Sequence, residues 1–338
     1  MGADISPKER LLRKLNGQSV DRCPVVCPGG MMNAATVEVM ERGGRALPKG
    51  HTDSAEMAAL AASVAELTGF ENYGAPFCMT VEAEALGSGI DYGSMECEPK
   101  IRAERYPSVV EALPRGVHAG RDGRVGVVAD ALSALSGGDI PVIGSVTGPI
   151  SAAASLVEPM MFLKQLVKER RDAHRVIDSV TDWLIGYAGI LAQSGADVIS
   201  IADPTATGEI LGPRMFEEYA LRYINRLADA VHAMGKPVVI HICGKLDAVT
   251  RLAALFHGDA LSVDAMVSPR SLKQACPGLN TMGNLSTFLL QDGSTEQVAR
   301  GAEALLRGGV DIIAPACGLS TSTPLANIRT FTDAVKDA

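Results

Sequence analysis

The stretch that decides the fold is Gly195-Ala196-Asp197-Val198-Ile199-Ser200-Ile201-Ala202-Asp203-Pro204. It begins with a glycine, which accepts the positive φ of a helix exit, and continues with a nearly unbroken run of apolar and β-branched residues. The same order recurs at residues 258–264 and 309–314. Apolar strands of this kind are typical of a parallel sheet that is buried on both faces. The stretch therefore predicts a β-strand that follows a helix, as a unit repeated along the chain.

Eight such units favour an α/β fold of the TIM (β/α)8 barrel type over a doubly wound sheet, as a single domain over residues 1–338. Helical patterns lie between the strands, and one apolar stripe at i, i+3, i+4 and i+7 spacing runs from Val176 to Leu191. Residues 87–138 fit the pattern poorly, so we expect an irregular insertion with a β-hairpin there. The strands are expected at residues 23–27, 70–77, 140–146, 197–202, 237–242, 260–264, 280–283 and 311–314.

Composition narrows the classes of function. The 338 residues include 39 acidic and 31 basic side chains, and the net charge of -8 argues against a general nucleic-acid surface. No stretch approaches the ~18 apolar residues of a membrane span, and the N-terminus has no apolar signal region. Seven cysteines without such a signal indicate reduced thiols. We therefore expect a cytoplasmic protein without membrane or nucleic-acid partners, acting on small molecules or proteins.

Two soft metal ligands stand at the end of one expected strand. His241 and Cys243 are two residues apart, so an extended backbone points both side chains to the same face, and Gly244 lets the chain turn directly afterwards. Cys317 lies just beyond another strand, at residues 311–314. One imidazole and two thiolates favour zinc and leave a fourth position for water or substrate. The alternative is a core histidine beside a buried cysteine, which the second strand end makes less favourable.

Three polar residues also end apolar strands, where the active site of a barrel lies. Asp264 follows the strand after the His-Cys strand, so it could fill the fourth zinc position when substrate is absent. Asp203 could hold or protonate a polar group of the substrate, and its alternative role is a cap of the next helix. Asn284 is a candidate for cofactor binding, although asparagine also stabilises turns.

Gly29 and Gly30 follow the first expected strand and would allow the backbone to approach a bound cofactor closely. The sequence has neither a GxGxxG between a strand and a helix nor a GxxxxGK[ST], so nucleotide chemistry lacks support. A serine nucleophile elbow is also missing. The glycines are therefore assigned to cofactor binding outside the nucleotide-binding classes.

The ligand set indicates chemistry at sulfur. A zinc ion with two thiolates and one imidazole is electron-rich, and it suits the binding of a substrate thiolate better than strong activation of water. Hydrolysis by a zinc hydroxide is the competing chemistry, but the strands with the ligands have no HExxH-like arrangement. Alkyl transfer to sulfur is therefore the favoured reaction.

Four motifs together resemble a known family. They are His241-Ile242-Cys243-Gly244, Ala202-Asp203-Pro204, Met282-Gly283-Asn284, and Ala314-Pro315-Ala316-Cys317-Gly318 followed by residues 323–328. The chain resembles, over nearly its whole length, the methylcobamide:coenzyme M methyltransferases of the uroporphyrinogen decarboxylase superfamily. The resemblance implies a TIM barrel, zinc (Zn2+) held by His241, Cys243 and Cys317, and a methylated corrinoid protein docked over the barrel mouth. It also implies that Asp264 completes the zinc shell until the acceptor thiol displaces it.

The expected function is transfer of a methyl group from a methylcobamide, carried by a corrinoid-binding protein, to coenzyme M or a similar thiol, or to tetrahydrofolate. One alternative is a donor-side methyltransferase that loads the corrinoid from a methoxylated or methyl halide substrate. A second is a decarboxylase-like lyase without metal, which fits poorly because Cys27-Pro28-Gly29-Gly30-Met31-Met32 replaces the arginine-rich motif of the decarboxylases. A third is a zinc-containing corrinoid-binding or regulatory barrel without turnover. The Pro-Gly-Gly-Met-Met segment looks like that of bacterial relatives.

Overall fold

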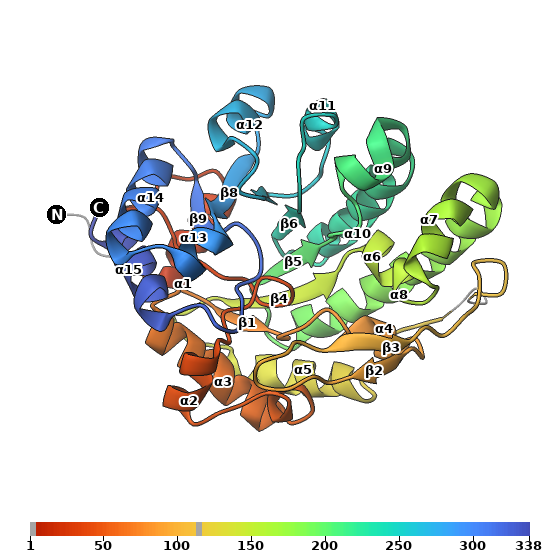
Figure 1. Ribbon diagram of the computed structural model, residues 1–338, viewed down its shortest axis with the longest axis horizontal. Coiled ribbons are helices and arrows are strands. Elements are labelled where there is room, and N and C mark those ends of the chain that lie inside the picture. Colours follow the sequence, from red (N-terminus) through yellow and green to blue (C-terminus); the bar gives the residue numbers. More distant parts are fainter. Residues whose placement is uncertain (1–4, 113–116) are drawn as a thin grey trace.

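A curled sheet of seven parallel strands forms the centre of the protein (Figure 1). The structure, a computed structural model, describes residues 5–112 and 117–338. Each strand pairs with the next along the chain, except that the β2–β3 hairpin is set apart from this sheet. The strands of the sheet are, in order, β1 (Tyr73–Ala75), β4 (Val142–Thr147), β5 (Val198–Ala202), β6 (Val238–Ile242), β7 (Ala260–Val263), β8 (Asn280–Leu285) and β9 (Ile312–Pro315).

Helices connect the strands and cover the outside of the sheet (Figure 1). The apolar stripe from Val176 to Leu191 lies on the longest of them, α8. Most of the stripe is buried, and α8 packs on β4 and β5 of the sheet. No helix in the described residues combines the length and apolar character of a membrane span. The α-helices are α1 (Pro7–Leu15), α2 (Val37–Gly43), α3 (Ser54–Thr68), α4 (Val81–Ala85), α5 (Arg124–Leu135), α6 (Pro149–Ala154), α7 (Pro159–Lys168), α8 (Arg170–Gln193), α9 (Gly208–Met215), α10 (Arg222–Ala233), α11 (Thr250–Ala253), α12 (Pro269–Ala275), α13 (Thr287–Asp292), α14 (Thr295–Arg307) and α15 (Leu325–Lys336), with a 3-10 helix η1 (Lys49–His51) and a π-helix η2 (Phe216–Leu221).

The first expected strand is present only as a bridge between Val25 and Ile313 of β9. On its other side, the side chain of Asn72 replaces a neighbouring strand. The Cys27 N–H donates to Asn72 Oδ1 at 2.8 Å, and Asn72 Nδ2 donates to the Cys27 carbonyl at 2.9 Å. A side-chain amide thus satisfies backbone groups that a regular ladder would have paired. For this reason, residues 23–27 bridge to β9 without forming a regular strand.

The segment at residues 87–138 is more regular than expected. It contains an antiparallel hairpin of β2 (Gly89–Asp91) and β3 (Lys100–Ala103). The expectation of irregular cover is wrong for its later part, where α5 buries Val125, Val128 and Leu132 at helical spacing. The glycines before α5 resemble a loop, so the start of this helix was not predicted. Gly123, at φ 58°, is the N-cap of the helix.

Helix α1 closes one end of the curled sheet. Leu11 and Leu15 pack in a single buried cluster with the inward-facing first residues of several strands. Lys8 pairs with Asp197, just before β5, at 2.7 Å, and Lys14 pairs with Asp311, just before β9, at 2.9 Å. These contacts are all at the amino ends of the strands. The carboxyl ends therefore form the open end of the sheet.

A buried histidine predicts how stability depends on pH. His51 is 1% exposed, and neither of its ring nitrogens has a hydrogen-bond partner among the described residues. Burial, assisted by the charge of Arg124, lowers the pKa of His51 from 6.5 to about 4. Between these values the unfolded chain binds a proton that the folded chain does not. The free energy of unfolding should therefore fall as the pH drops from 6.5 to 4, by at most about 3 kcal/mol.

Urea denaturation at pH 7.5 and pH 5 measures this effect. The His51→Leu variant, which cannot titrate, should lose less stability between the two pH values than the original chain. His118→Gln, a change at an exposed histidine, is the matched control and should leave the difference intact. An unchanged pH dependence in His51→Leu would contradict the assignment.

Candidate metal centre

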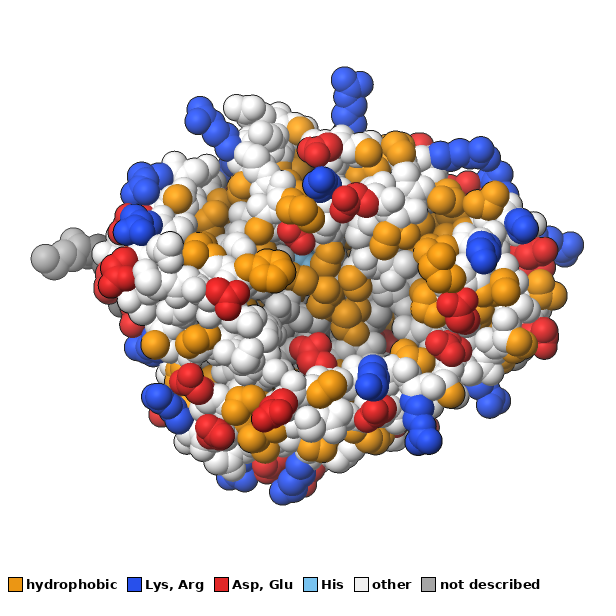
Figure 2. All heavy atoms as spheres, viewed as in Figure 1, with side chains coloured by type: hydrophobic (Ala, Val, Ile, Leu, Met, Phe, Trp, Pro, Cys, Tyr) orange, Lys and Arg blue, Asp and Glu red, His pale blue; other side chains and the backbone are white. Residues whose placement is uncertain are grey.

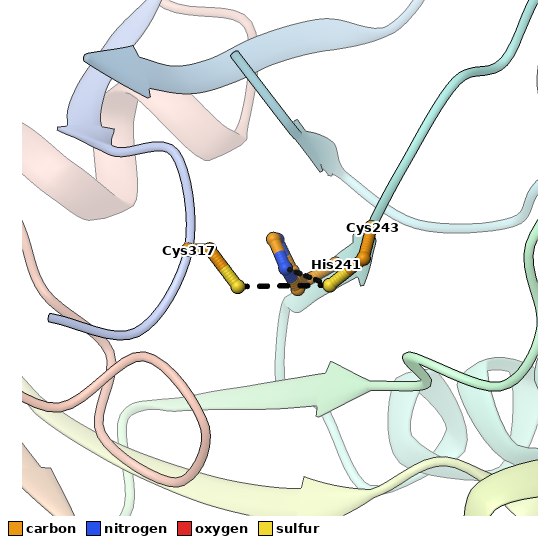
Figure 3. Close-up of side chains that lie close together, drawn as sticks. All are labelled: His241, Cys243 and Cys317. Carbon is orange, nitrogen blue, oxygen red and sulfur yellow. Dashed lines mark hydrogen bonds between the residues drawn. The ribbon is translucent and has the colours of Figure 1, made fainter. Parts of the chain in front are cut away.

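His241, Cys243 and Cys317 come together at the open end of the sheet (Figure 3). Their ligand atoms all lie within 4.8 Å of one another. His241 Nε2 is 3.1 Å from Cys243 Sγ, which is 3.7 Å from Cys317 Sγ. Among the described residues this is the one group of at least three such side chains with this spacing. We call it the His-Cys-Cys cluster.

Local backbone geometry explains how the cluster forms. His241 is the fourth residue of β6 and Cys243 follows directly after the strand, so both side chains leave the backbone on the same side. Gly244 turns the chain at φ 72°, where a Cβ would lie 2.7 Å from Glu209 Oε2. Cys317 reaches the cluster from the loop after β9. Strands β6 and β9 belong to the same parallel sheet, so their carboxyl ends lie at the same edge.

Ser262 orients the imidazole. Its Oγ lies on the adjacent strand β7, 2.9 Å from His241 Nδ1, and both residues are fully buried. A partner at Nδ1 leaves Nε2 to face the sulfur atoms, which is the arrangement that metal-binding histidines usually have. Sequence reasoning missed Ser262, although a serine in the middle of a buried apolar strand was an available signal.

The two thiols have unequal acidities. Their mutual hydrogen bond lowers the pKa of Cys317 to about 4, and His241 contributes in the same direction. The same contact, together with burial, raises the pKa of Cys243. Contact between the two thiols therefore favours ionisation of one of them. An oriented imidazole and two converging sulfur atoms fit a zinc ion, which binds both thiols as thiolates.

Asp264 lies beside the cluster but outside it. Its Oδ2 accepts a hydrogen bond from the Gly244 N–H at 3.3 Å, and its Oδ1 accepts one from the Met266 N–H at 3.1 Å. The group of mutually close ligand atoms in the described residues includes no carboxylate. The role of Asp264 as a fourth ligand therefore stays a prediction that requires its side chain to move.

Asp203 is used within the fold. It is fully buried, and its carboxylate accepts hydrogen bonds from the Ile150 N–H and from both the N–H and Oγ of Ser151. It thus caps helix α6, which precedes it in the chain, instead of the next helix. Burial raises the pKa of Asp203 to about 6, and the hydrogen bonds oppose this rise. These contacts favour a positioning role over direct contact with substrate.

Asn284 braces the loop that carries Asp264. Its Nδ2 donates to the carbonyls of Asp264 and Val267, each at 2.8 Å. Its amide donor is therefore used within the protein, in the manner of a turn-stabilising asparagine. Its assignment to cofactor binding stays a prediction.

Gly29 and Gly30 are needed for packing of the loop after residues 23–27. A Cβ at Gly29 would lie 2.8 Å from the Gly74 backbone carbon, and a Cβ at Gly30 would lie 2.8 Å from the Ser145 Cβ. This close packing carries Met31 to the cluster, where its Sδ is 3.9 Å from Cys243 Sγ. Sequence reasoning missed Met31, although it directly follows two glycines after the first expected strand.

A cavity of about 490 Å3 adjoins the cluster at Cys317. Figure 2, drawn from the same side as Figure 1, shows a hollow near the middle of the molecule. Apolar side chains lie in this hollow, and most Lys and Arg side chains lie toward the outer edge of the molecule. The cavity is bounded by the loop at Met31, the β2–β3 hairpin, α13 and the loop after β9. Its lining residues are Met31, Glu96, Cys97, Glu98, Thr287, Phe288, Gln291, Cys317, Gly318, Leu319, Ser320 and Thr321.

The fold and the candidate site together define an α/β protein that has a curled parallel sheet and a candidate soft-metal centre at the carboxyl ends of its strands. Within that class, residues 6–338 match the uroporphyrinogen decarboxylase family, and the chain belongs to this family. The resemblance noted in the motifs is confirmed, because methylcobamide:CoM methyltransferases match the chain over almost its whole length.

Two relatives and one solved structure define this similarity. The methylcobamide:CoM methyltransferase MtbA of Methanosarcina acetivorans is 32% identical, with 99% of this chain and 98% of the relative covered. The methylcobamide:CoM methyltransferase MtaA of Methanosarcina barkeri is 31% identical, with 97% and 96% covered. A methyltransferase structure from Methanosarcina mazei superimposes with a TM-score of 0.90 at 31% identity, and covers 98% of this chain and 99% of its own.

Proposed function

We propose that this chain is a zinc-dependent methyltransferase, which moves a methyl group from a methylcobamide, presented by a corrinoid-binding protein, to an acceptor thiol. The observation that carries the proposal is the His-Cys-Cys cluster at the open end of the sheet. Its support is the full-length similarity to enzymes named for methylcobamide and coenzyme M. The proposal includes a cytoplasmic location and a TIM barrel in which residues 23–27 act as the first of eight strands.

The protein's own residues would prepare the acceptor. Zinc held by His241, Cys243 and Cys317 would supply the Lewis acidity that keeps the acceptor sulfur ionised at neutral pH. Ser262 fixes the imidazole, and the Met31 loop covers one side of the cluster. The carboxylate of Asp264 accepts a hydrogen bond from the Gly244 N–H. We propose that Asp264 fills the fourth zinc position until the acceptor thiol displaces it.

The transfer is a substitution at the methyl carbon. The acceptor sulfur forms the new S–C bond, the Co–C bond breaks, and its electron pair stays with cobalt, which changes from Co(III) to Co(I). The proton of the acceptor thiol goes to solvent when that thiol binds. Holding the two reactants in line at the base of a cleft supplies the proximity and orientation that such a bimolecular reaction lacks in solution.

Metal content and demethylation of free methylcobalamin, measured together, test the proposed function. We expect one zinc per chain and optical loss of methylcobalamin that depends on an added thiol. Removal of the metal with a chelator should abolish turnover, and added zinc should restore it. Coenzyme M and tetrahydrofolate are offered separately. Full turnover by the metal-free chain would contradict the role of zinc.

The remaining outcomes separate the alternatives. Turnover with tetrahydrofolate alone would replace the thiol acceptor with a pterin. Bound zinc without turnover with either acceptor would indicate a donor-side enzyme or a regulatory barrel, and these two are separated by offering methyl donors to the Co(I) form. Absence of zinc would return the chain to the decarboxylase branch of its family.

A further inference from the structure

The cavity beside Cys317 is lined by acidic side chains and by no basic ones, although it adjoins a sulfur that would bind zinc as an anion. Its lining includes two carboxylates, Glu96 and Glu98, and none of its lining residues is Lys, Arg or His. Met31 and Cys317 both line this cavity and both contact Cys243 of the cluster. A thiol bound at the cluster can therefore extend its substituent into the cavity.

Glu98 makes one side-chain contact among the described residues, and the loop that carries it is held by two further hydrogen bonds. Its Oε1 accepts a hydrogen bond from Asn33 Nδ2 at 3.3 Å. The hairpin turn that carries Glu98 is closed by the Ser94 N–H, which donates to the Cys97 carbonyl at 2.8 Å. The same turn is held to the loop after β9, because Thr321 Oγ1 donates to the Glu96 carbonyl at 3.0 Å. The carboxylate is therefore held at the cavity by the fold.

The surroundings of Glu98 make its charge significant. Glu98 is exposed to solvent, although partial burial of its carboxyl raises its pKa. Met31, Phe288 and Leu319 give the same cavity apolar walls. A charge beside such walls is screened less than one on an open surface.

Coenzyme M, the acceptor in the names of the relatives, carries a sulfonate on the second carbon from its sulfur. In this cavity a sulfonate would meet two carboxylates of its own sign and no cation from the lining residues. An ammonium group at the same place would instead be attracted. Unlike charges a few ångströms apart at a partly exposed site change affinity by roughly three- to thirtyfold, and like charges do so in the opposite direction.

We propose that the acceptor of this chain is a thiol with a short apolar stem and a cationic or uncharged end, and that Glu98 selects it against anionic thiols. This inference rests on the proposed function, since it concerns the acceptor of the same reaction. Glu98 is then a specificity-determining residue at the far end of the acceptor.

Three thiols with the same two-carbon skeleton test the proposal. They are 2-aminoethanethiol, 2-mercaptoethanol and 2-mercaptoethanesulfonate, which end in an ammonium, a hydroxyl and a sulfonate group. Calorimetric titration into the zinc-loaded protein gives their affinities, and demethylation of methylcobalamin gives their KM values. We expect the ammonium thiol to bind most tightly and the sulfonate thiol least tightly.

The Glu98→Gln variant removes the charge and keeps the size of the side chain. Relative to the original chain it should weaken the ammonium thiol and strengthen the sulfonate thiol, each by roughly three- to thirtyfold, and change the hydroxyl thiol least. Comparing each thiol with itself cancels differences in thiol acidity. Glu66→Gln, an equal charge change at an exposed position of α3, is the matched control and should leave all three affinities alone. Glu96→Gln repeats the test if the first variant folds poorly.

Two results overturn the inference and leave the proposed function standing: tightest binding of the sulfonate thiol by the original chain, or affinities that do not respond to either glutamate variant. Failure of the proposed function is different and visible in the same data. In that case none of the three thiols would bind to the zinc-loaded protein or support demethylation of methylcobalamin.

Discussion

Replacement of Cys317 with alanine is expected to remove most of the bound zinc and to reduce methyl transfer to background. Cys317 is the one member of the cluster that comes from outside the β6 segment. Losses of supporting residues around metal sites already cost about 10- to 100-fold in affinity or activity, so loss of a ligand should cost at least the upper end of that range.

Elemental analysis and methylcobalamin demethylation, on the same preparation, measure both losses. Cys276→Ala is the control, because Cys276 is a free, buried cysteine outside the cluster, with its sulfur 3.9 Å from the Thr250 carbonyl. That variant should retain zinc and activity. Circular dichroism checks that Cys317→Ala is folded. A folded Cys317→Ala with one zinc per chain and full turnover would refute the proposed mechanism.

Replacement of Glu71 with alanine is expected to cause the largest loss of stability among single changes considered. Glu71 is 6% exposed and accepts hydrogen bonds from Arg10 and Arg22, each at 2.9 Å, and from the Val25 N–H at 3.1 Å. Arg10 is 2% exposed, and Asp21 would remain as a partner for its charge. Removal of one member of a buried ion pair costs about 3–5 kcal/mol, and the remaining contact with Asp21 places the expectation near 3 kcal/mol.

Urea denaturation with a fixed slope measures this loss as a lower midpoint. Glu71→Gln keeps an acceptor oxygen and should lose less stability than Glu71→Ala. The control is Glu66→Ala, at an exposed position on α3, which should stay within about 0.5 kcal/mol of the original chain. Equal midpoints for Glu71→Ala and Glu66→Ala would show that the contacts of Glu71 with Arg10, Arg22 and Val25 do not stabilise the fold.

Seven of the eight expected strands are present in the sheet, because short strands between turn residues can be recognised from local sequence. The prediction failed in the first segment, where the partners of Cys27 are the side-chain atoms of Asn72, forty-five residues away. A pattern confined to one segment contains no information about such a partner. The same limit applies to α5, whose glycine-rich start resembled a loop.

The candidate site shows the same division. The convergence of His241 and Cys243 could be predicted, because the two-residue repeat of a strand fixes their common direction. Met31 and Ser262 carried local signals, but their contacts with the cluster depend on packing between distant segments, as does the position of the hairpin loop that carries Glu98. Asp203 was placed correctly at a strand end, but its partners belong to the preceding β/α unit.

The closure of the sheet by α1 has a consequence for the order of events in a catalytic cycle. With Leu11 and Leu15 packed at the amino ends of the strands, the entrance to the candidate site lies at their carboxyl ends. In the proposed reaction, a docked corrinoid protein would cover that entrance. The small acceptor must then enter before the partner arrives, and the methylated product can leave only after the partner has gone. We therefore expect an ordered sequence of binding and release.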